Sequence, residues 1–408
     1  MVHGGKKTSM KSKFCHLIST LFVLSIAIFP FSASASMTTI RYKVPSKFEN
    51  WNIEIYGYAP SENRTVKGVI FVVPGTNGFA EPNITQTNLS NKLTIKHPTD
   101  LAKTFVDAGY IYLTANYRGV RSFYECINQN EIVPKAFVDN CVDLNIRKTL
   151  DFEKIEADIE SAVLFIKSKK ELGVYPLIVT AVSEGGIHVS RLIQQKKINP
   201  VGIIGIGIPT TSAHDNIKTQ ISLSVELRIV LSYMKKNGRN KFCPSDIKKA
   251  LPYISDESDQ ILRNNLFQVC RVDSDMHAYM SEARKLVDKQ LLYALREAKP
   301  FEGTVFGLKV SEYFGYKWLL DVVNDRDSLY EKLSRYQGSV YLLYGQFDST
   351  VEIKLVDFCK SNRRPKHLCK IEFLPNSDHV LEDKSSTIPK ETLNLLVKYA
   401  NSIVHGMR

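Results

Sequence analysis

The sequence predicts an α/β fold with a mostly parallel central sheet, helices on both faces and a helical cap inserted late in the sheet. Strand-like runs rich in Val, Ile and Tyr alternate with helical patterns in two blocks. Several of these runs are continuously apolar, as strands covered on both faces are. Between residues 210 and 337 the strand-like runs disappear and helical patterns replace them. One sheet interrupted by one helical insertion accounts for all three observations.

Eight runs are predicted as strands, and the first two are expected to form an antiparallel edge pair. The runs are Thr39–Val44, Trp51–Ala59, Lys67–Val73, Tyr110–Asn116, Pro176–Val182, Val201–Ile208, Ser339–Tyr344 and Lys370–Leu374.

Two long segments are predicted as helices that cover the sheet. Residues Asp151–Leu172 place apolar side chains at helical spacing on one face, and the acidic residues at the start suit a helix N-terminus. Residues Lys390–Val404 repeat the pattern and are expected to close one face of the sheet. In the cap, Ile221–Lys235 and Ala278–Ala298 have helical patterns. The aromatic stretch Phe301–Trp318 is expected either to line a substrate cavity or to form the cap's own core.

The first 35 residues have the layout of a cleaved secretory signal. Four lysines precede an apolar run, Phe14–Phe31, which is interrupted by Pro30 and followed by Ala33-Ser34-Ala35. The run is short for a membrane span, so cleavage after Ala35 is expected, with no stable anchor afterwards. The predicted organisation is therefore residues 1–35 as signal, 36–209 as the first part of the core, 210–337 as the cap and 338–408 as the second part of the core.

Charge and cysteine usage fit an exported protein rather than a nucleic-acid binder. The net charge is +12, but the basic residues are scattered among acidic ones and no groove-reading motif accompanies them. Six cysteines remain after the signal, and an even number in an exported chain suggests disulfides. Each nearest-neighbour pair brackets a single loop or helical excursion. The expected pairs are Cys126 with Cys141, Cys243 with Cys270, and Cys359 with Cys369.

The strongest chemical signal is the stretch Thr180–Gly186, Thr-Ala-Val-Ser-Glu-Gly-Gly, between an apolar strand and a helical pattern. Such a turn exposes a serine hydroxyl at the end of the strand, and its neighbours must be small to avoid the strand and the helix. Ala181 stands where this motif usually has its first glycine. Ser183 is therefore the predicted nucleophile.

A serine needs a base to remove its proton and an acid to orient that base. Asp348 follows the strand-like run Ser339–Tyr344, and His379 follows the last run. Both lie beyond the carboxyl end of a strand, in the order serine, acid, histidine. Asp348 and His379 are thus the predicted partners of Ser183, with Asp378 or a cap carboxylate as the alternative acid.

The oxyanion of an acyl-transfer intermediate needs two backbone donors. One is expected from the amide of Glu184, directly after the nucleophile. The other is expected from the loop Pro74–Gly78, which follows an early strand, with Thr76 as the first candidate donor and Asn77 as the second.

Taken together, these motifs resemble the α/β-hydrolase superfamily, and in particular its capped esterase and serine-peptidase-like branches. The resemblance rests on the Pro74-Gly75 loop, Tyr117-Arg118-Gly119, Ser183-Glu184-Gly185, the spacing of Gly345 and Asp348, and Asp378-His379. It covers residues 67–183 and 338–408, and it leaves the cap without a known counterpart. Arg121 stands where such families often have a glycine.

The resemblance implies a serine hydrolase that cleaves a carboxylic ester in a small-molecule or acyl-bearing substrate, and the signal-like N-terminus indicates that it is exported. The same groups would serve a peptidase, an amidase or a thioesterase, and a non-catalytic binding protein is the alternative from another class. No phosphate-binding loop, metal-binding motif or cofactor motif is present in the sequence, so neither a metal nor a cofactor is predicted. The acyl group, the leaving group and the oligomeric state cannot be read from the pattern.

Overall fold

The computed structural model describes most of the chain beyond residue 36. The described residues are 37–48, 51–61, 64–76, 78, 84–87, 92–95, 99–121, 131–132, 140–222, 241–242, 271–272, 285, 289, 291–293, 296, 304–305, 308–309, 315–348, 351, 359, 368–383, 385 and 387–406. The predicted signal segment lies outside them.

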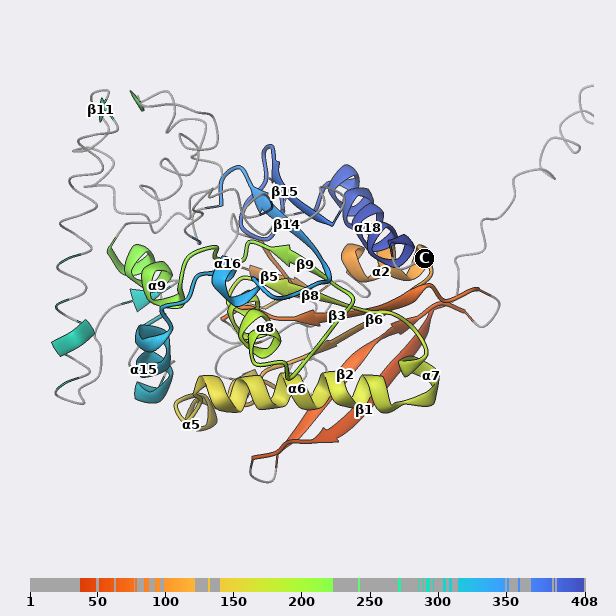
Figure 1. Cartoon of the computed structure of the whole chain (residues 1–408), viewed down its shortest axis with the longest axis horizontal. Coiled ribbons are helices and arrows are strands. Elements are labelled where there is room, and N and C mark those ends of the chain that lie inside the picture. Colours follow the sequence, from red (N-terminus) through yellow and green to blue (C-terminus); the bar gives the residue numbers. More distant parts are fainter. Residues whose placement is uncertain are drawn as a thin grey trace, which may run out of the picture. The chain divides into compact units, whose positions relative to one another are not determined.

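The core is an eight-stranded sheet in the order β1-β2-β6-β3-β8-β9-β14-β15 (Figure 1). β2 pairs antiparallel with both β1 and β6, and all the other neighbours are parallel. The strands are β1 Thr38–Pro45, β2 Asn52–Ala59, β3 Gly68–Val73, β6 Tyr110–Ala115, β8 Leu177–Val182, β9 Gly202–Ile206, β14 Ser339–Gly345 and β15 Cys369–Leu374. This order, with its one antiparallel strand inside the sheet, is that of the α/β-hydrolase fold. The predicted fold class and all eight predicted strands are confirmed.

Helices cover both faces of the sheet. On one face lie α6 (Phe152–Ser168), α7 (Lys170–Gly173) and α8 (Gly185–Gln194), and on the other lie α2 (Asp100–Asp107) and α18 (Lys390–His405) (Figure 1). The helix expected at residues 151–172 is divided into α6 and α7, since Lys169 has an extended backbone. α2, whose N-terminus is capped by Thr99, was not predicted.

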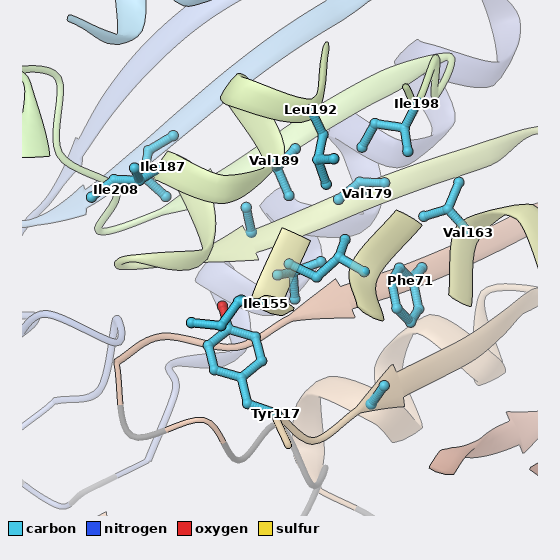
Figure 2. Packing of buried hydrophobic residues seen from close by; sticks show 14 of the residues in the cluster. Phe71, Tyr117, Ile155, Val163, Val179, Ile187, Val189, Leu192, Ile198 and Ile208 are labelled. Carbon is cyan, nitrogen blue, oxygen red and sulfur yellow. The ribbon is translucent and has the colours of Figure 1, made fainter. Parts of the chain in front are cut away.

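Strand β3 shows why the central runs are apolar throughout. Val69, Phe71 and Val73 pack into the cluster beneath α6 and α8, while Ile70 and Val72 pack into the cluster beneath α2 and α18. Because successive side chains of a strand point to opposite faces, a strand covered on both sides needs apolar residues at every position. Figure 2 shows Phe71 in the first of these clusters.

Residues 210–337 connect β9 to β14, which lie side by side in the sheet. The described part contains α9 (Ala213–Ser222), α15 (Tyr316–Asn324) and α16 (Leu329–Lys332). It also contains two short antiparallel pairs, β10 (Lys241–Phe242) with β11 (Arg271–Val272) and β12 (Thr304–Val305) with β13 (Leu308–Lys309). Most of the two predicted cap helices lies outside the described residues, so the limits of the cap remain a prediction.

Two smaller features lie between β3 and α6 in the sequence. A three-stranded sheet is formed by β4 (Ile84–Thr87), β5 (Lys92–Ile95) and β7 (Glu131–Ile132), and the short helix α5 spans Leu144–Arg147. The sequence did not predict this sheet, because its strands are too short to carry a continuous apolar run.

One predicted disulfide, between Cys359 and Cys369, is present, with 5.4 Å between the two Cα atoms. Cys141 is also disulfide-bonded, and its expected partner Cys126 lies outside the described residues. Cys243 and Cys270 also lie outside the described residues, so their pairing remains a prediction. No helix in the described part of the chain is both long enough and apolar enough to cross a membrane.

Candidate active site

Ser183 occupies the turn between β8 and α8 in a backbone conformation that few residues other than glycine adopt. Its φ is +51°, and its amide donates a hydrogen bond to the carbonyl of Ile206, at the end of β9, at 3.0 Å. A positive φ costs free energy and persists only where the surrounding structure enforces it. This is the strained strand-to-helix turn that the sequence predicted around Ser183.

The small residues around Ser183 are required by close backbone approach. A Cβ on Gly75 would lie 2.9 Å from the Cβ of Ser183, and one on Gly185 would lie 2.4 Å from the carbonyl oxygen of Pro74. A Cβ on Gly186 would meet the side chain of Ile208 at 2.5 Å. The loop after β3 can therefore lie directly against the turn that carries Ser183.

His379 and Asp348 are in contact, as the sequence predicted. Nδ1 of His379 lies 3.0 Å from Oδ1 of Asp348, which is fully buried. Asp348 follows β14 and His379 follows β15, while Ser183 follows β8. Because these strands are parallel, all three residues lie at the same edge of the sheet.

The imidazole of His379 packs closely against Gly207, which lies directly after β9. Its φ is +55°, and a Cβ there would lie 2.7 Å from Cε1 and Nδ1 of the imidazole. The imidazole thus packs against the residue that follows Ile206, to which the amide of Ser183 is bonded. No hydrogen bond joins the Ser183 hydroxyl to His379 in the described residues. In enzymes without substrate such bonds are often long and tighten only in the complex.

The two predicted oxyanion donors lie at the same place. Thr76 and Glu184 both line the pocket that contains Ser183. Among the described residues, neither backbone amide donates to another acceptor. Asn77, the second candidate for the loop, lies outside the described residues.

The loop that carries Thr76 is anchored by two buried side chains whose contacts the sequence did not predict. Arg147 Nη2 donates to the carbonyl oxygen of Thr76 at 2.9 Å, and the Tyr117 hydroxyl donates to the carbonyl oxygen of Pro74 at 2.8 Å. Tyr117 belongs to the Tyr117-Arg118-Gly119 motif, which did not reveal this role, and Arg147 belongs to no motif. They hold the loop against the turn of Ser183.

A narrow pocket that is partly open to solvent lies beside Ser183. Its apolar lining residues come from α8, α9 and α15, and its other lining residues are polar. The lining residues are Thr76, Ser183, Glu184, Ile187, Ala213, Asn216, Ile217, Gln220, Trp318 and Val322. Trp318 ends the aromatic stretch expected to line a cavity or form the cap's core, and it does line this cavity. Residues 301–314 are mostly outside the described part of the chain.

His188 is a site neighbour whose importance the sequence did not reveal. It is fully buried on α8 between the carboxylates of Glu184 and Glu156. The i, i+4 spacing of Glu184 and His188 was the available signal, since it places both side chains on one face of a helix. Glu156, on α6, could be found only from the fold.

Two buried carboxyl groups flank His379. Oδ1 of Asp378 accepts hydrogen bonds from the amides of Val380 and Glu382, both at 2.9 Å. Burial raises the pKa of Asp378 to about 6, despite these donors.

Burial, with Asp378 beside it, raises the pKa of Glu382 to about 9. Oε2 of Glu382 has no hydrogen-bond partner among the described residues. Glu382 is therefore a neutral acid at pH 7.

The raised pKa of Glu382 predicts a stability that falls as the pH rises. The folded protein keeps this proton up to about pH 9, whereas the unfolded chain loses it above its usual value of 4.5. In that window the unfolded state binds fewer protons, so the free energy of unfolding falls by about 1.4 kcal/mol per pH unit. Glu382→Gln removes this term, so the variant should match the wild type near pH 5 and exceed its stability at pH 8.

Urea unfolding at pH 5, 6.5 and 8 measures this difference. Glu391→Gln, on the exposed side of α18, is the control for the loss of one carboxyl group. Parallel stability curves for Glu382→Gln and the wild type would show that Glu382 is already ionised in the folded protein.

In the described residues, no three His, Cys, Asp or Glu side chains gather closely enough to hold a metal ion. The candidate site instead combines a strained serine, a partly exposed histidine paired with a buried aspartate, and two candidate backbone amides at one edge of the sheet.

The fold makes this chain an α/β-hydrolase-fold protein. No protein-family model and no curated protein sequence matches it. Solved structures that resemble it include Est1E from Butyrivibrio proteoclasticus, with 12% sequence identity, a TM-score of 0.43, and coverage of 90% of this chain and 97% of that one. A thermophilic esterase from Thermogutta terrifontis is 12% identical, with a TM-score of 0.41 and coverage of 89% and 99%. Carboxyl esterase 2 from Tuber melanosporum is 13% identical, with a TM-score of 0.46 and coverage of 92% and 89%.

Proposed function

We propose that this protein is a serine hydrolase that cleaves carboxylic esters through an acyl-enzyme on Ser183. The observation that carries the proposal is the strained conformation of Ser183, φ +51°, at the sheet edge where His379 and Asp348 are paired. A structural role does not require a serine in this conformation, whereas a nucleophile must project its hydroxyl beyond the strand end.

In the first half of the reaction the Ser183 hydroxyl attacks the ester carbonyl carbon while Nε2 of His379 takes its proton. The Asp348 carboxylate accepts a hydrogen bond from Nδ1–H of His379 and stays ionised, which fixes the tautomer and stabilises the imidazolium. The amides of Glu184 and Thr76 hold the oxyanion. The tetrahedral intermediate then expels the alcohol, which receives the proton from His379, and the acyl group remains on Ser183.

In the second half a water molecule replaces the alcohol. His379 takes a proton from this water, whose oxygen attacks the acyl carbonyl carbon. The second tetrahedral intermediate collapses, Ser183 leaves with the proton from His379, and the carboxylic acid departs. The enzyme returns to its starting state without any external reductant, oxidant or cofactor.

Ester hydrolysis is tested with p-nitrophenyl esters beside aminoacyl p-nitroanilides. We expect hydrolysis of the esters and little or no hydrolysis of the anilides. Activity confined to the anilides would replace the esterase with a peptidase that uses the same residues. Activity on neither, with a folded protein, would favour a binding function for the fold.

We further propose that the protein is exported and cleaved after Ala35. The basic and apolar N-terminal sequence supports this, and the Cys359–Cys369 disulfide is compatible with an oxidising compartment. Mass spectrometry of the protein recovered from an exporting host should place the new N-terminus at Ser36. Recovery of the uncleaved chain in the reducing cytosol alone would contradict export.

A further inference from the structure

A row of six ionisable side chains runs from the turn of Ser183 into the segment between β9 and β14. Acidic and basic side chains alternate along it, and all six residues except Arg191 are deeply buried. The row is Glu184, His188, Glu156, Arg191, Asp325 and Lys332. The mechanism proposed above uses only the backbone of Glu184 and none of the other five residues.

At the Ser183 end of the row, the imidazole of His188 lies between two carboxylates. Its Nε2 is 3.4 Å from Oε1 of Glu184, and its Nδ1 is 3.6 Å from Oε1 of Glu156. Burial opposes the charged imidazole, but Glu156 and Glu184 outweigh it and raise the pKa of His188. Burial likewise opposes the Glu184 carboxylate, yet His188, Trp318 and Thr76 lower its pKa below the usual value. Glu184 and His188 thus each favour the charged form of the other.

At the other end of the row, Asp325 connects the helices of the pocket wall. Arg191 pairs with Glu156 and, through Nη1 at 3.1 Å, with Oδ1 of Asp325. Oδ2 of Asp325 accepts from Nζ of Lys332 at 2.6 Å and from the amide of Ala213 at 3.1 Å. Asp325 directly follows α15 and Ala213 begins α9. The row therefore links α9 and α15, two of the three helices that form the pocket wall.

Such a row is a poor way to gain stability. Removing charges from water costs nearly as much as, or more than, their attraction returns, and well-packed apolar side chains often stabilise a core better. What paired charges do supply is position, because each tolerates few arrangements of its neighbours. A positional role is also suggested by where the row ends.

Glu184 ends the row inside the pocket, in contact with Trp318. The indole Nε1 of Trp318 donates to Oε1 of Glu184 at 2.7 Å, and the hydroxyl of Thr76 donates to the same carboxylate. Trp318 is only 4% exposed and forms part of the apolar wall with Ile217 and Val322. The carboxylate next to the nucleophile therefore fixes the largest side chain of the pocket.

We infer that Glu184 is a positioning residue and Trp318 a specificity-determining one. The Glu184 carboxylate, balanced by His188, holds the indole across the pocket, which then admits only short acyl groups, from acetyl to butyryl. The cavity volume is only about 20 Å³, which leaves room for roughly one or two water molecules. This inference rests on the proposed function and adds its substrate class.

The test compares acyl-chain selectivity in the wild type, Glu184→Ala, Glu184→Gln and Trp318→Leu. The measured quantity is the ratio of kcat/KM for p-nitrophenyl butyrate to that for p-nitrophenyl octanoate. We expect the wild type to prefer butyrate by about tenfold or more, and Trp318→Leu and Glu184→Ala to reduce that ratio by about tenfold. Octanoate hydrolysis by Trp318→Leu should rise in absolute terms, which general damage to the fold does not produce.

Glu184→Gln tests the position of the indole separately from the charge. Its amide oxygen can still accept from Trp318, so we expect a ratio closer to the wild type than that of Glu184→Ala. Glu153→Ala, an exposed carboxylate on α6, is the matched control and should keep the wild-type ratio.

Fluorescence supplies a readout that needs no substrate. The chain has two tryptophans, so a Trp51→Phe background leaves Trp318 as the single reporter. In that background Glu184→Ala should shift the emission to longer wavelength, because the indole loses its buried partner, and Glu184→Gln should shift it less.

The results separate this inference from the proposed function. An active, folded Glu184→Ala protein with an unchanged ratio and unchanged emission would overturn the role of Glu184. An unchanged ratio in Trp318→Leu would overturn the role of the indole, even if Glu184→Ala failed to fold. A wild type that hydrolyses no ester would overturn the proposed function and the substrate class with it, whereas ester activity without chain-length preference would overturn the substrate class alone.

Discussion

Replacing Ser183 with alanine should reduce kcat for ester hydrolysis by about 10⁴-fold or more. The substitution removes the attacking oxygen and leaves His379, Asp348 and the two oxyanion amides in place. Alanine also adopts the positive φ less readily than glycine does, but the turn already holds a residue with a Cβ there. The residual rate would come from binding and from the oxyanion donors alone. Initial rates with p-nitrophenyl butyrate measure the loss.

The control is Ser190→Ala on the same helix. Ser190 is buried, and its hydroxyl donates to the carbonyl of Ile187 at 2.8 Å, so it has a structural partner of its own. We expect this variant to retain activity within a few-fold of the wild type. Wild-type activity in Ser183→Ala would place the nucleophile elsewhere and remove the basis of the proposed mechanism.

Replacing Asp348 with asparagine should lower kcat by about 10⁴-fold with little effect on folding. Oδ1 of Asp348 lies 3.0 Å from Nδ1 of His379 and holds the proton on that nitrogen. An asparagine amide at this place can donate to Nδ1, which favours the opposite tautomer and leaves Nε2 unable to accept the Ser183 proton. Steady-state kinetics with the same ester measure the effect.

Asp378→Asn is the matched control for the acid. Asp378 is adjacent to His379 in sequence and is also buried, but its Oδ1 accepts from the amides of Val380 and Glu382. An asparagine oxygen can keep both hydrogen bonds, so we expect only a small change in kcat. A large loss in Asp378→Asn together with an active Asp348→Asn would reverse the assignment of the acid.

The sheet was predictable because its strands are buried on both faces. A run such as that of β3 is apolar at every position, and few other structures require this pattern. The positions of Ser183, Asp348 and His379 followed from the same source, since each lies just beyond a strand that the sequence marks clearly. The strand order itself required the structure, because no pattern in β6 reveals that it pairs with both β2 and β3.

The groups around these three residues could not be predicted, because their contacts join distant parts of the chain. Glu156 and Asp325 are both ordinary charged residues in the sequence, and only the fold brings them to Arg191. Arg147 likewise reaches Thr76 across 71 positions. Charged residues in helical patterns normally face water, and burial in a paired row is the exception. The sequence therefore predicted the candidate reacting groups but not the residues that position them.

The central claim is that Ser183 is a nucleophile activated by His379. The most direct measurement is the reaction of the folded protein with a fluorophosphonate probe, with the adduct located by peptide mass spectrometry in the wild type, Ser183→Ala and His379→Ala. We predict an adduct on Ser183 in the wild type and none in either variant. A folded wild-type protein that forms no adduct, or forms it on another residue, would contradict the claim.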